Sequence, residues 1–472
     1  MSFADIGYWL FLPTVLLLYQ PSSLLYRKFL LLAASWFFYS MWSFPFLFLL
    51  IYSSLADYHC ALAVEKSKSE RRRKLFLAVS LASNLGPLIF FKYFVFLNNT
   101  LNDALGLINF HIPAASFNII LPLGISFYTF QTMTYSLDVY NRKFPAERNR
   151  LDFMLYVAFF PQLVAGPIVR AQEFLPQIKS LRHTTEADFC AGAELIVSGL
   201  IKKLIFANNF ADFLEPVFKN PGEYSGITCM LAVAGFGIQI YGDFSGYTDI
   251  GRGSARLFGF DLPINFDKPY LARSPRDFWR RWHITLSVII RDYVYIPLGG
   301  NRSGKTRQYI NAFVSMTICG LWHGAAYHFI VWGMYHGVGL VLYDWLFSGV
   351  RKHSGERENS GIFNAIIAAA GGFITFIFVQ MGWIFFRAES MTIAWTMLGR
   401  IFLHPFSGGG ANPTWILLMG LFYWLMLVKN SGYQYNFLFE RGIIARSLIM
   451  LTALLLLIIF MGKSTEFIYF VF

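Results

Sequence analysis

The sequence predicts an all-α integral membrane protein with many spanning helices, and two observations carry this prediction. Hydrophobic residues make up 56% of the 472 residues and charged residues only 14%, whereas an average soluble domain has about 25% charged residues. The apolar residues also form long runs, such as 448–461, which only Thr452 interrupts. A helix needs about 20 mostly apolar residues to cross a bilayer. We therefore expect the chain to reside in a membrane.

Apolar segments recur from one end of the chain to the other, and no soluble domain interrupts them. We expect roughly eleven spans, centred near residues 14, 35, 50, 85, 128, 158, 200, 235, 320, 338 and 375, with two or three more apolar segments between 392 and 463. Residues 1–472 are expected to form one transmembrane domain, with some spans short or re-entrant. Lys and Arg cluster in 66–74 and 142–150 but are absent from 98–118, which places the first two loops in the cytoplasm and the third on the far side.

The net charge of +12 raises the question of a nucleic-acid partner. Because the Lys and Arg residues lie in short clusters between apolar spans, they are typical of topology signals and lipid-headgroup contacts, so we predict membrane lipid and no nucleic acid. The four cysteines are far apart and are expected to be buried thiols. Histidines at helical spacing with a third ligand are missing, so we expect neither a metal site nor a bound cofactor.

Residues 260–308 form the most unusual stretch, because they are too charged to span lipid alone and too aromatic for a solvated loop. Prolines break regular helix here, and Gly299-Gly300 marks a turn. One interpretation is an interfacial amphipathic segment anchored by Arg and Trp. The other is the wall of a cytoplasmic pocket whose arginines bind an anionic donor, such as a CoA phosphate or an acidic carrier protein. The candidate donor-binding residues are Arg276, Arg280, Arg281, Arg291 and Trp282.

Ionisable side chains inside apolar spans cost about 2.5–3.5 kcal/mol to insert, so each needs a reason. His323 is the clearest case, because it follows an apolar run and lies between Trp322 and Gly324. A histidine satisfied by a backbone carbonyl is the more common situation. The functional alternative is a general base that deprotonates a hydroxyl as it attacks a thioester. Gly320 and Gly324 would leave room beside the imidazole for a thin acyl chain, and His336 could line the same pore.

A second polar group of residues is YGDFSGYTDIGRG at 241–253. Asp243 and Asp249 are six residues apart and would lie on different faces of a continuous helix. The glycines between and after them favour close helix packing over a binding loop, so we expect a structural role and retain both carboxylates as candidate pore-lining groups.

Eight blocks between residues 121 and 390 resemble the signature segments of the membrane-bound O-acyltransferase (MBOAT) family, in the family's order. They are LPLGISFYTFQTMTYSLDVY, FFPQLVAGPIVR, DFSGYTDIGRG, INFDKPY, DFWRRWHITLS, RDYVYIPLGGNR, LWHGAAYHFIVWGMYHG and MGWIFFRAES. The branch resembled is the bacterial one that contains the membrane subunits of alginate and peptidoglycan O-acetyltransferases.

This resemblance implies a ring of helices around a central pore, with His323 as the family's essential histidine and His283 as its second polar landmark. It further implies that acetyl groups pass from a cytoplasmic donor, either acetyl-CoA or an acylated carrier, across the bacterial inner membrane. A periplasmic acetyltransferase or carrier protein would then complete O-acetylation of an exported polysaccharide.

Combining both lines, we expect the donor to dock near the four arginines, His323 to deprotonate the attacking hydroxyl, and His283 or a backbone amide to stabilise the oxyanion. Two alternatives remain: an acyl-group channel without chemistry of its own, and a self-sufficient lipid or protein acyltransferase. The terminal FIYFVF is typical of membrane-interface anchoring, with partner docking as the alternative.

Overall fold

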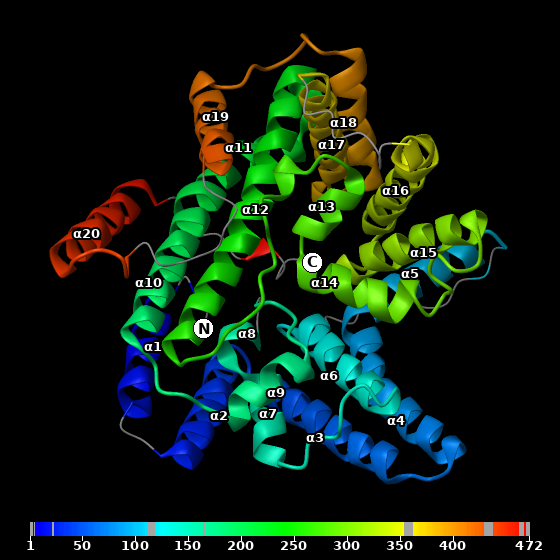
Figure 1. Cartoon of the computed structure of the whole chain (residues 1–472). Helices are drawn as coiled ribbons and strands as arrows, with labels where there is room; N and C mark the ends of the chain where they lie inside the picture. Colours follow the sequence, from blue (N-terminus) through cyan, green and yellow to red (C-terminus); the bar gives the residue numbers. More distant parts are fainter. Residues whose placement is uncertain are drawn as a thin grey trace. The chain divides into compact units, whose positions relative to one another are not determined.

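The structure is a computed structural model that describes residues 3, 5–20, 23–108, 110, 119–163, 166–353, 362–428, 438–461 and 467–468. Within these residues every regular element is a helix, and the one β-type contact is an isolated bridge between Tyr224 and Gly409. The predicted all-α class is confirmed (Figure 1). The four cysteines are buried and form no disulfide, as the sequence predicts.

The chain divides into two compact units, and each unit combines segments that are far apart in the sequence. Unit 1 contains residues 1–199, 247–263 and 435–450, and unit 2 contains 200–246, 264–434 and 451–472. The expectation of a single transmembrane domain stays a prediction.

Unit 1 is built mainly from helices α1 to α10 and the π-helical turn η1. Their bounds are α1 Ile6–Tyr19, α2 Leu24–Ser40, α3 Phe44–Lys66, α4 Glu70–Leu88, η1 Ile89–Tyr93, α5 Phe94–Gly106, α6 Ile125–Tyr140, α7 Arg150–Ala158, α8 Phe160–Leu163, α9 Ala171–Lys179 and α10 Glu186–Leu200.

A buried carboxylate holds three of these helices together. Asp57 of α3 accepts hydrogen bonds from Ser80 and Asn84 of α4, the latter at 2.7 Å, and from Ser136 of α6 at 3.3 Å. The hydroxyl of Ser53 in turn donates to the Asn84 carbonyl oxygen at 2.6 Å. A carboxylate so supplied with donors is tolerated in an apolar core.

Two predicted features of this unit need correction. The helix that begins at Glu70 continues through a π-helical turn to Gly106, so the expected loop starts later than residue 98. The span predicted near residue 158 is broken at Phe159. Pro161 lacks the N–H that would have continued the helix, and the neighbouring Phe160 N–H instead donates to the Ser35 hydroxyl at 3.0 Å.

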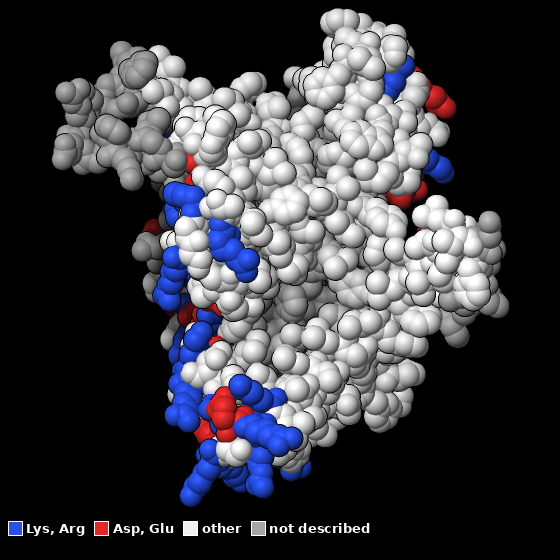
Figure 2. Space-filling model, turned by 90° about the vertical axis from the view of Figure 1, so that its right-hand side faces the viewer, with Lys and Arg blue, Asp and Glu red and all other residues white. Residues whose placement is uncertain are grey.

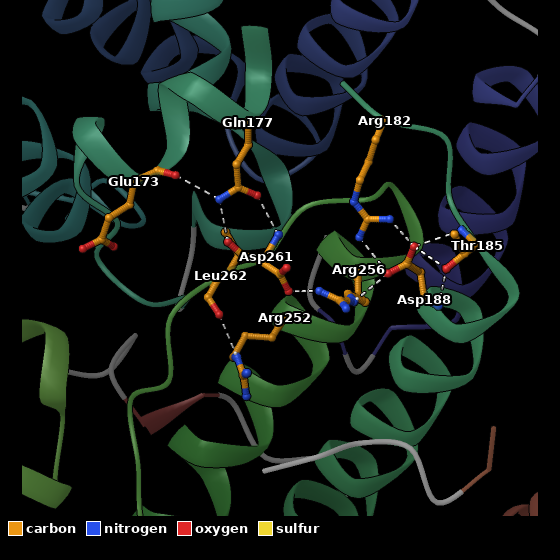
Figure 3. A network of polar contacts seen from close by, with 9 residues as sticks. All are labelled: Glu173, Gln177, Arg182, Thr185, Asp188, Arg252, Arg256, Asp261 and Leu262. Carbon is orange, nitrogen blue, oxygen red and sulfur yellow. Dashed lines mark hydrogen bonds and ion pairs between the residues drawn. The ribbon is translucent and has the colours of Figure 1, made fainter. Parts of the chain in front are cut away.

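A polar network fastens the end of α12 (Gly226–Leu257) within unit 1 (Figure 3). Asp188 pairs with Arg256 at 2.9 Å and accepts a hydrogen bond from Arg182 at 2.7 Å. Gln177 exchanges two hydrogen bonds with the backbone of Asp261, at 2.8 and 3.0 Å. Burial opposes ionisation of Asp188, but the hydrogen bonds from Arg182 and Thr185 outweigh it and lower its pKa below the ordinary value of 3.8.

Unit 2 holds the remaining elements. Their bounds are η2 Ile201–Ala207, α11 Asn208–Lys219, η3 Pro221–Glu223, η4 Pro269–Leu271, α13 Pro275–Arg281, α14 Ile284–Ile290, η5 Arg291–Tyr295, α15 Lys305–His323, α16 Tyr327–His353, α17 Ile362–Arg387, α18 Met391–Leu403, α19 Pro413–Val428 and α20 Ile443–Phe460. Helices α12 and α20 each contribute residues to both units.

Helix lengths and surface composition make the chain a multi-pass membrane protein. Five helices in the described residues are long and apolar enough to cross a bilayer, namely Phe44–Lys66, Glu70–Gly106, Gly226–Leu257, Ile366–Arg387 and Ile443–Phe460, and shorter apolar helices accompany them. Most of the surface visible in Figure 2 carries no charge, and Lys and Arg gather in clusters, as expected for a surface that faces lipid between charged loops. The predicted number of spans stays a prediction.

Candidate functional site

The segment 264–300 in unit 2 is broken into short helices, and the breaks position His283. Helix α13 begins at Pro275, after Ser274 accepts a hydrogen bond from the Asp277 N–H at 3.1 Å, a typical helix N-cap. The next helix begins at Ile284, and His283 between the two helices has a φ of 42°. A left-handed residue other than glycine costs about 1–2 kcal/mol, so surrounding contacts must hold it.

Asn265 supplies those contacts. Its backbone carbonyl accepts the Ile284 N–H at 3.0 Å, and its side-chain oxygen accepts the Thr285 N–H at 3.2 Å and the Thr285 hydroxyl at 2.7 Å. Asn265 is fully buried. It therefore ties the INFDKPY block to the turn that presents His283.

His323 is the last residue of α15 and is buried, with 3% of its surface exposed. Its ring lies 5.0 Å from Trp322, 5.0 Å from Trp332 and 5.2 Å from Phe386, between ring centroids. These neighbours come from the end of α15, from α16 and from α17, so the imidazole lies at the meeting point of three helices.

The structure brings the two predicted catalytic histidines to the same indole. The Trp322 ring lies 6.0 Å from His283 and 5.0 Å from His323. His283 is fully buried, and Phe244 of α12 packs edge-on against it at 4.7 Å. His283 lies outside the helices that are long enough to cross a membrane. Burial lowers the pKa of His283 to about 3, so the ring is neutral at physiological pH and carries one N–H donor.

His336 and Trp282 lie in the aromatic layer next to this pair. His336 is fully buried, 4.9 Å from Trp332 and 5.2 Å from Trp279. Trp282 is buried and lies 5.0 Å from Trp383. The remaining histidine of LWHGAAYHF, His328, lies on α16, where its Nδ1 is 3.0 Å from the Phe385 carbonyl oxygen. His328 thus contacts a backbone carbonyl, which is the common situation that we expected from the sequence for a histidine in an apolar span.

The two glycines beside His323 serve helix packing, which differs from the free space that we expected. A Cβ at Gly320 would lie 2.2 Å from the Phe329 carbonyl oxygen and 2.9 Å from Gly333, and a Cβ at Gly324 would lie 2.1 Å from the Phe329 ring. The absent side chains let α15 and α16 approach with their backbones in contact. The space beside the imidazole at these two positions is filled by α16.

The predicted donor-binding arginines are mostly paired with acidic residues. Arg276 pairs with Asp344 of α16, and Gln308 donates to the same carboxylate at 3.1 Å. Arg281 pairs with Asp277 at 2.8 Å. The remaining two are more exposed: Arg291 pairs with its neighbour Asp292 at 2.7 Å, and Arg280 forms no ion pair among the described residues. Binding of a donor by these arginines stays a prediction.

The two aspartates of 241–253 have separate surroundings, as their six-residue spacing predicts. Asp243 lies in unit 2 and pairs with Lys203 at 2.7 Å. Asp249 lies in unit 1, 3.8 Å from Arg252. The expected glycine packing is present, because a Cβ at Gly251 would lie 2.3 Å from the Pro161 carbonyl oxygen.

Within the described residues, no group of three or more His, Cys, Asp or Glu side chains is arranged to hold a metal ion. The site is thus a layer of aromatic rings around three buried imidazoles, those of His283, His323 and His336. Such a site suits proton transfer at a hydroxyl or thioester that reaches a largely dry, apolar interior. These features define a multi-pass membrane protein whose interior histidines can act as acid or base.

Comparison with known proteins gives the class. Residues 29–379 match the profile of MBOAT, the membrane-bound O-acyltransferase family, and the chain belongs to this family. It is 38% identical over 403 residues to a probable alginate O-acetylase AlgI of Pseudomonas syringae, covering 84% of this chain and 74% of that protein. It is 35% identical over 404 residues to a peptidoglycan O-acetyltransferase of Helicobacter pylori, covering 79% and 73%.

A more distant relative is a teichoic acid D-alanyltransferase of Streptococcus thermophilus, 29% identical over 317 residues, covering 64% of this chain and 72% of that protein. The chain is therefore a membrane O-acyltransferase similar to an alginate O-acetylase, a peptidoglycan O-acetyltransferase and a teichoic acid D-alanyltransferase. The predicted family and reaction class are confirmed. The roles of individual residues stay predictions.

Two residues of the site were not singled out from the sequence. Asn265 belongs to the INFDKPY block, but no role was predicted for it. It lies 18 residues before His283, which is too far along the chain for a local sequence pattern to connect the two. Lys203 had a clearer signal, because a lysine inside the apolar segment near residue 200 needs a buried partner.

Proposed function

We propose that this chain takes an acetyl group from a cytoplasmic thioester and passes it across the bacterial inner membrane for O-acetylation of an exported polysaccharide. The observation that supports this most is the burial of His323 and His283 against one shared indole, inside the region that matches the family. The names of two kinds of relative, a probable alginate O-acetylase and a peptidoglycan O-acetyltransferase, favour acetyl as the group transferred.

The chemical step requires one base and one stabiliser of negative charge. His323 takes the proton of an acceptor hydroxyl as its oxygen attacks the thioester carbonyl carbon, and a C–O bond forms. The tetrahedral intermediate carries its charge on the former carbonyl oxygen, to which the neutral His283 donates its N–H. The C–S bond then breaks, the thiolate leaves, and the proton held by His323 passes to that sulfur.

The donor approaches from the side of the arginine-bearing segment. Arg280 is exposed and forms no ion pair within the described part of the chain, so it is available to an anionic donor such as acetyl-CoA or the acidic surface of an acylated carrier. A periplasmic acetyltransferase or carrier protein receives the acetyl group on the far side. The relatives' names support an alginate-like or other envelope glycan as the final acceptor.

Reconstituted vesicles test this proposal. Purified protein is oriented in liposomes with [14C]acetyl-CoA on one side and an oligosaccharide plus the periplasmic acetyltransferase of the same organism on the other. The expected result is label on the glycan, with one thiol released per acetyl transferred. Labelled acetyl-CoA crossing intact, without thiol release, would support the channel alternative. Label on lipid or on the protein without the partner would support the self-sufficient acyltransferase.

A further inference from the structure

Residues 467–468 form a short C-terminal segment that lies close to His283 in unit 2. The short red segment in Figure 1, Phe467–Ile468, lies beside α12. Both side chains are buried. The Phe467 ring packs against Phe244 at 5.9 Å, and Phe244 packs against His283 at 4.7 Å. One aromatic ring therefore separates the C-terminal segment from a predicted catalytic imidazole.

A buried ion pair anchors this segment. The Asp243 carboxylate uses one oxygen for the Lys203 ammonium, at 2.7 Å, and the other for the Ile468 backbone N–H, also at 2.7 Å. Both charged side chains are almost fully buried, with 1% and 4% of their surface exposed. A hydrogen bond from a backbone N–H to a carboxylate is roughly twice as strong as one between neutral groups.

The local sequence explains why the ion pair forms there. A Cβ at Gly242 would lie 2.9 Å from the Lys202 carbonyl oxygen, so α12 approaches the π-helical turn η2 with its backbone in contact. That approach puts Asp243 opposite Lys203. The next residue along α12 is Phe244, so one short stretch of helix carries both the anchor and the ring that contacts His283.

We propose that Asp243 and Lys203 are positioning residues, which hold the C-terminal segment against Phe244 so that Phe244 fixes the orientation of the His283 ring. This inference rests on the proposed function, because it assigns His283 to acyl transfer. The inference goes beyond the proposed function because it gives the ion pair and the C-terminal segment a role in the site. The alternative is an ion pair that only joins η2 to α12.

Two double variants separate these roles. Asp243→Asn with Lys203→Met removes both buried charges and keeps an oxygen that can accept the Ile468 N–H. Asp243→Ala with Lys203→Met removes the same charges and the acceptor. Since both lack the ion pair, they match each other in the loss of the η2–α12 link and differ in the anchor of the chain end.

The first measurement does not depend on activity. Ile468→Cys is introduced into the parent chain and into both double variants, and labelling by a membrane-permeant maleimide is followed in detergent. The parent chain without the new cysteine controls for background, because its four cysteines are buried. We expect slow labelling in the parent and the Asn/Met variant and at least tenfold faster labelling in the Ala/Met variant. Equal rates in the two double variants would overturn the anchor.

The second measurement is steady-state acyl transfer by the same double variants. Displacement of a catalytic group by about 1 Å can cost about 100-fold in rate, so the kcat of the Ala/Met variant should fall by that order below the kcat of the Asn/Met variant, with similar KM for the donor. Equal kcat values would contradict the positioning role. If the parent itself transfers no acetyl group, the proposed function fails, and the labelling result still decides whether Asp243 holds the chain end.

Discussion

The turn that carries His283 depends on one amide side chain, and its removal gives a quantitative prediction. Asn265→Ala deletes the acceptor of two hydrogen bonds, from the Thr285 N–H at 3.2 Å and from the Thr285 hydroxyl at 2.7 Å. The hydroxyl can rotate to another acceptor, but the N–H is held by the helix. The change therefore removes the side-chain acceptor of a buried N–H two residues after a histidine that already has a φ of 42°.

The magnitude follows from the two bonds. A neutral hydrogen bond contributes about 0.5–1.5 kcal/mol net, and a buried donor left unsatisfied costs about 1–3 kcal/mol, so Asn265→Ala should cost about 2–4 kcal/mol. If that free energy is lost from the conformation that presents His283, acyl transfer slows by about 30- to 1,000-fold. Thr285→Val removes only the hydroxyl bond and should cost about 1 kcal/mol, or about fivefold in rate.

The assay is acyl transfer at saturating donor by the two single variants and the double variant, with thermal unfolding in detergent as the control for folding. Because Asn265→Ala already removes the hydrogen bond between Asn265 and the Thr285 hydroxyl, Thr285→Val should add little in that background. Fully additive effects, or an Asn265→Ala protein with parental activity and melting temperature, would refute the positioning of His283 by Asn265.

Three further predictions concern other parts of the chain. Gly320→Ala should abolish stable folding or activity, because its Cβ would overlap the backbone of α16, whereas Gly420→Ala, with nothing within 4 Å, should be tolerated; both are read by size exclusion and activity. Asp188→Asn should cost about 1.5–3 kcal/mol, measured by unfolding at several pH values. Because the pKa of Asp188 is lowered in the folded protein, its contribution to the free energy of unfolding is present above pH 3.8 and is lost as the pH falls through the folded pKa. The Asn variant should therefore lose less stability than the parent over that acidic range. Arg280→Ala should raise the KM for an anionic donor several-fold with little change in kcat, and an unchanged KM would exclude this exposed arginine from donor binding.

Local structure in the site was largely predictable from the sequence. The predicted break in regular helix is present at Pro275, where α13 begins, and Gly299-Gly300 do lie in a turn, with φ values of 111° and 54°. These features depend on the covalent restrictions of proline and the freedom of glycine, which act within a few residues. The all-α membrane class followed from composition for the same reason, since hydropathy is a property of each segment alone.

Contacts between distant segments were not predictable. The partner of Arg276 is Asp344, 68 residues away, and the anchor of Ile468 is Asp243, 225 residues away. Gly320 was read as free space, but α16 fills it. Each of these contacts depends on which helices pack against each other. The local pattern of a single sequence does not reveal that packing.

The proposed proton transfer by His323 is tested by comparing two buried histidines of neighbouring helices. Thiol release from acetyl-CoA is measured in nanodiscs, in the presence of the acceptor, for the parent, His323→Ala and His328→Ala, with melting temperatures confirming folding. Loss of a general base costs about 10²–10⁴-fold, so His323→Ala should fall by that factor, while His328→Ala, whose imidazole contacts the Phe385 carbonyl, should retain turnover. Parental turnover in a folded His323→Ala protein would exclude His323 from the proton transfer.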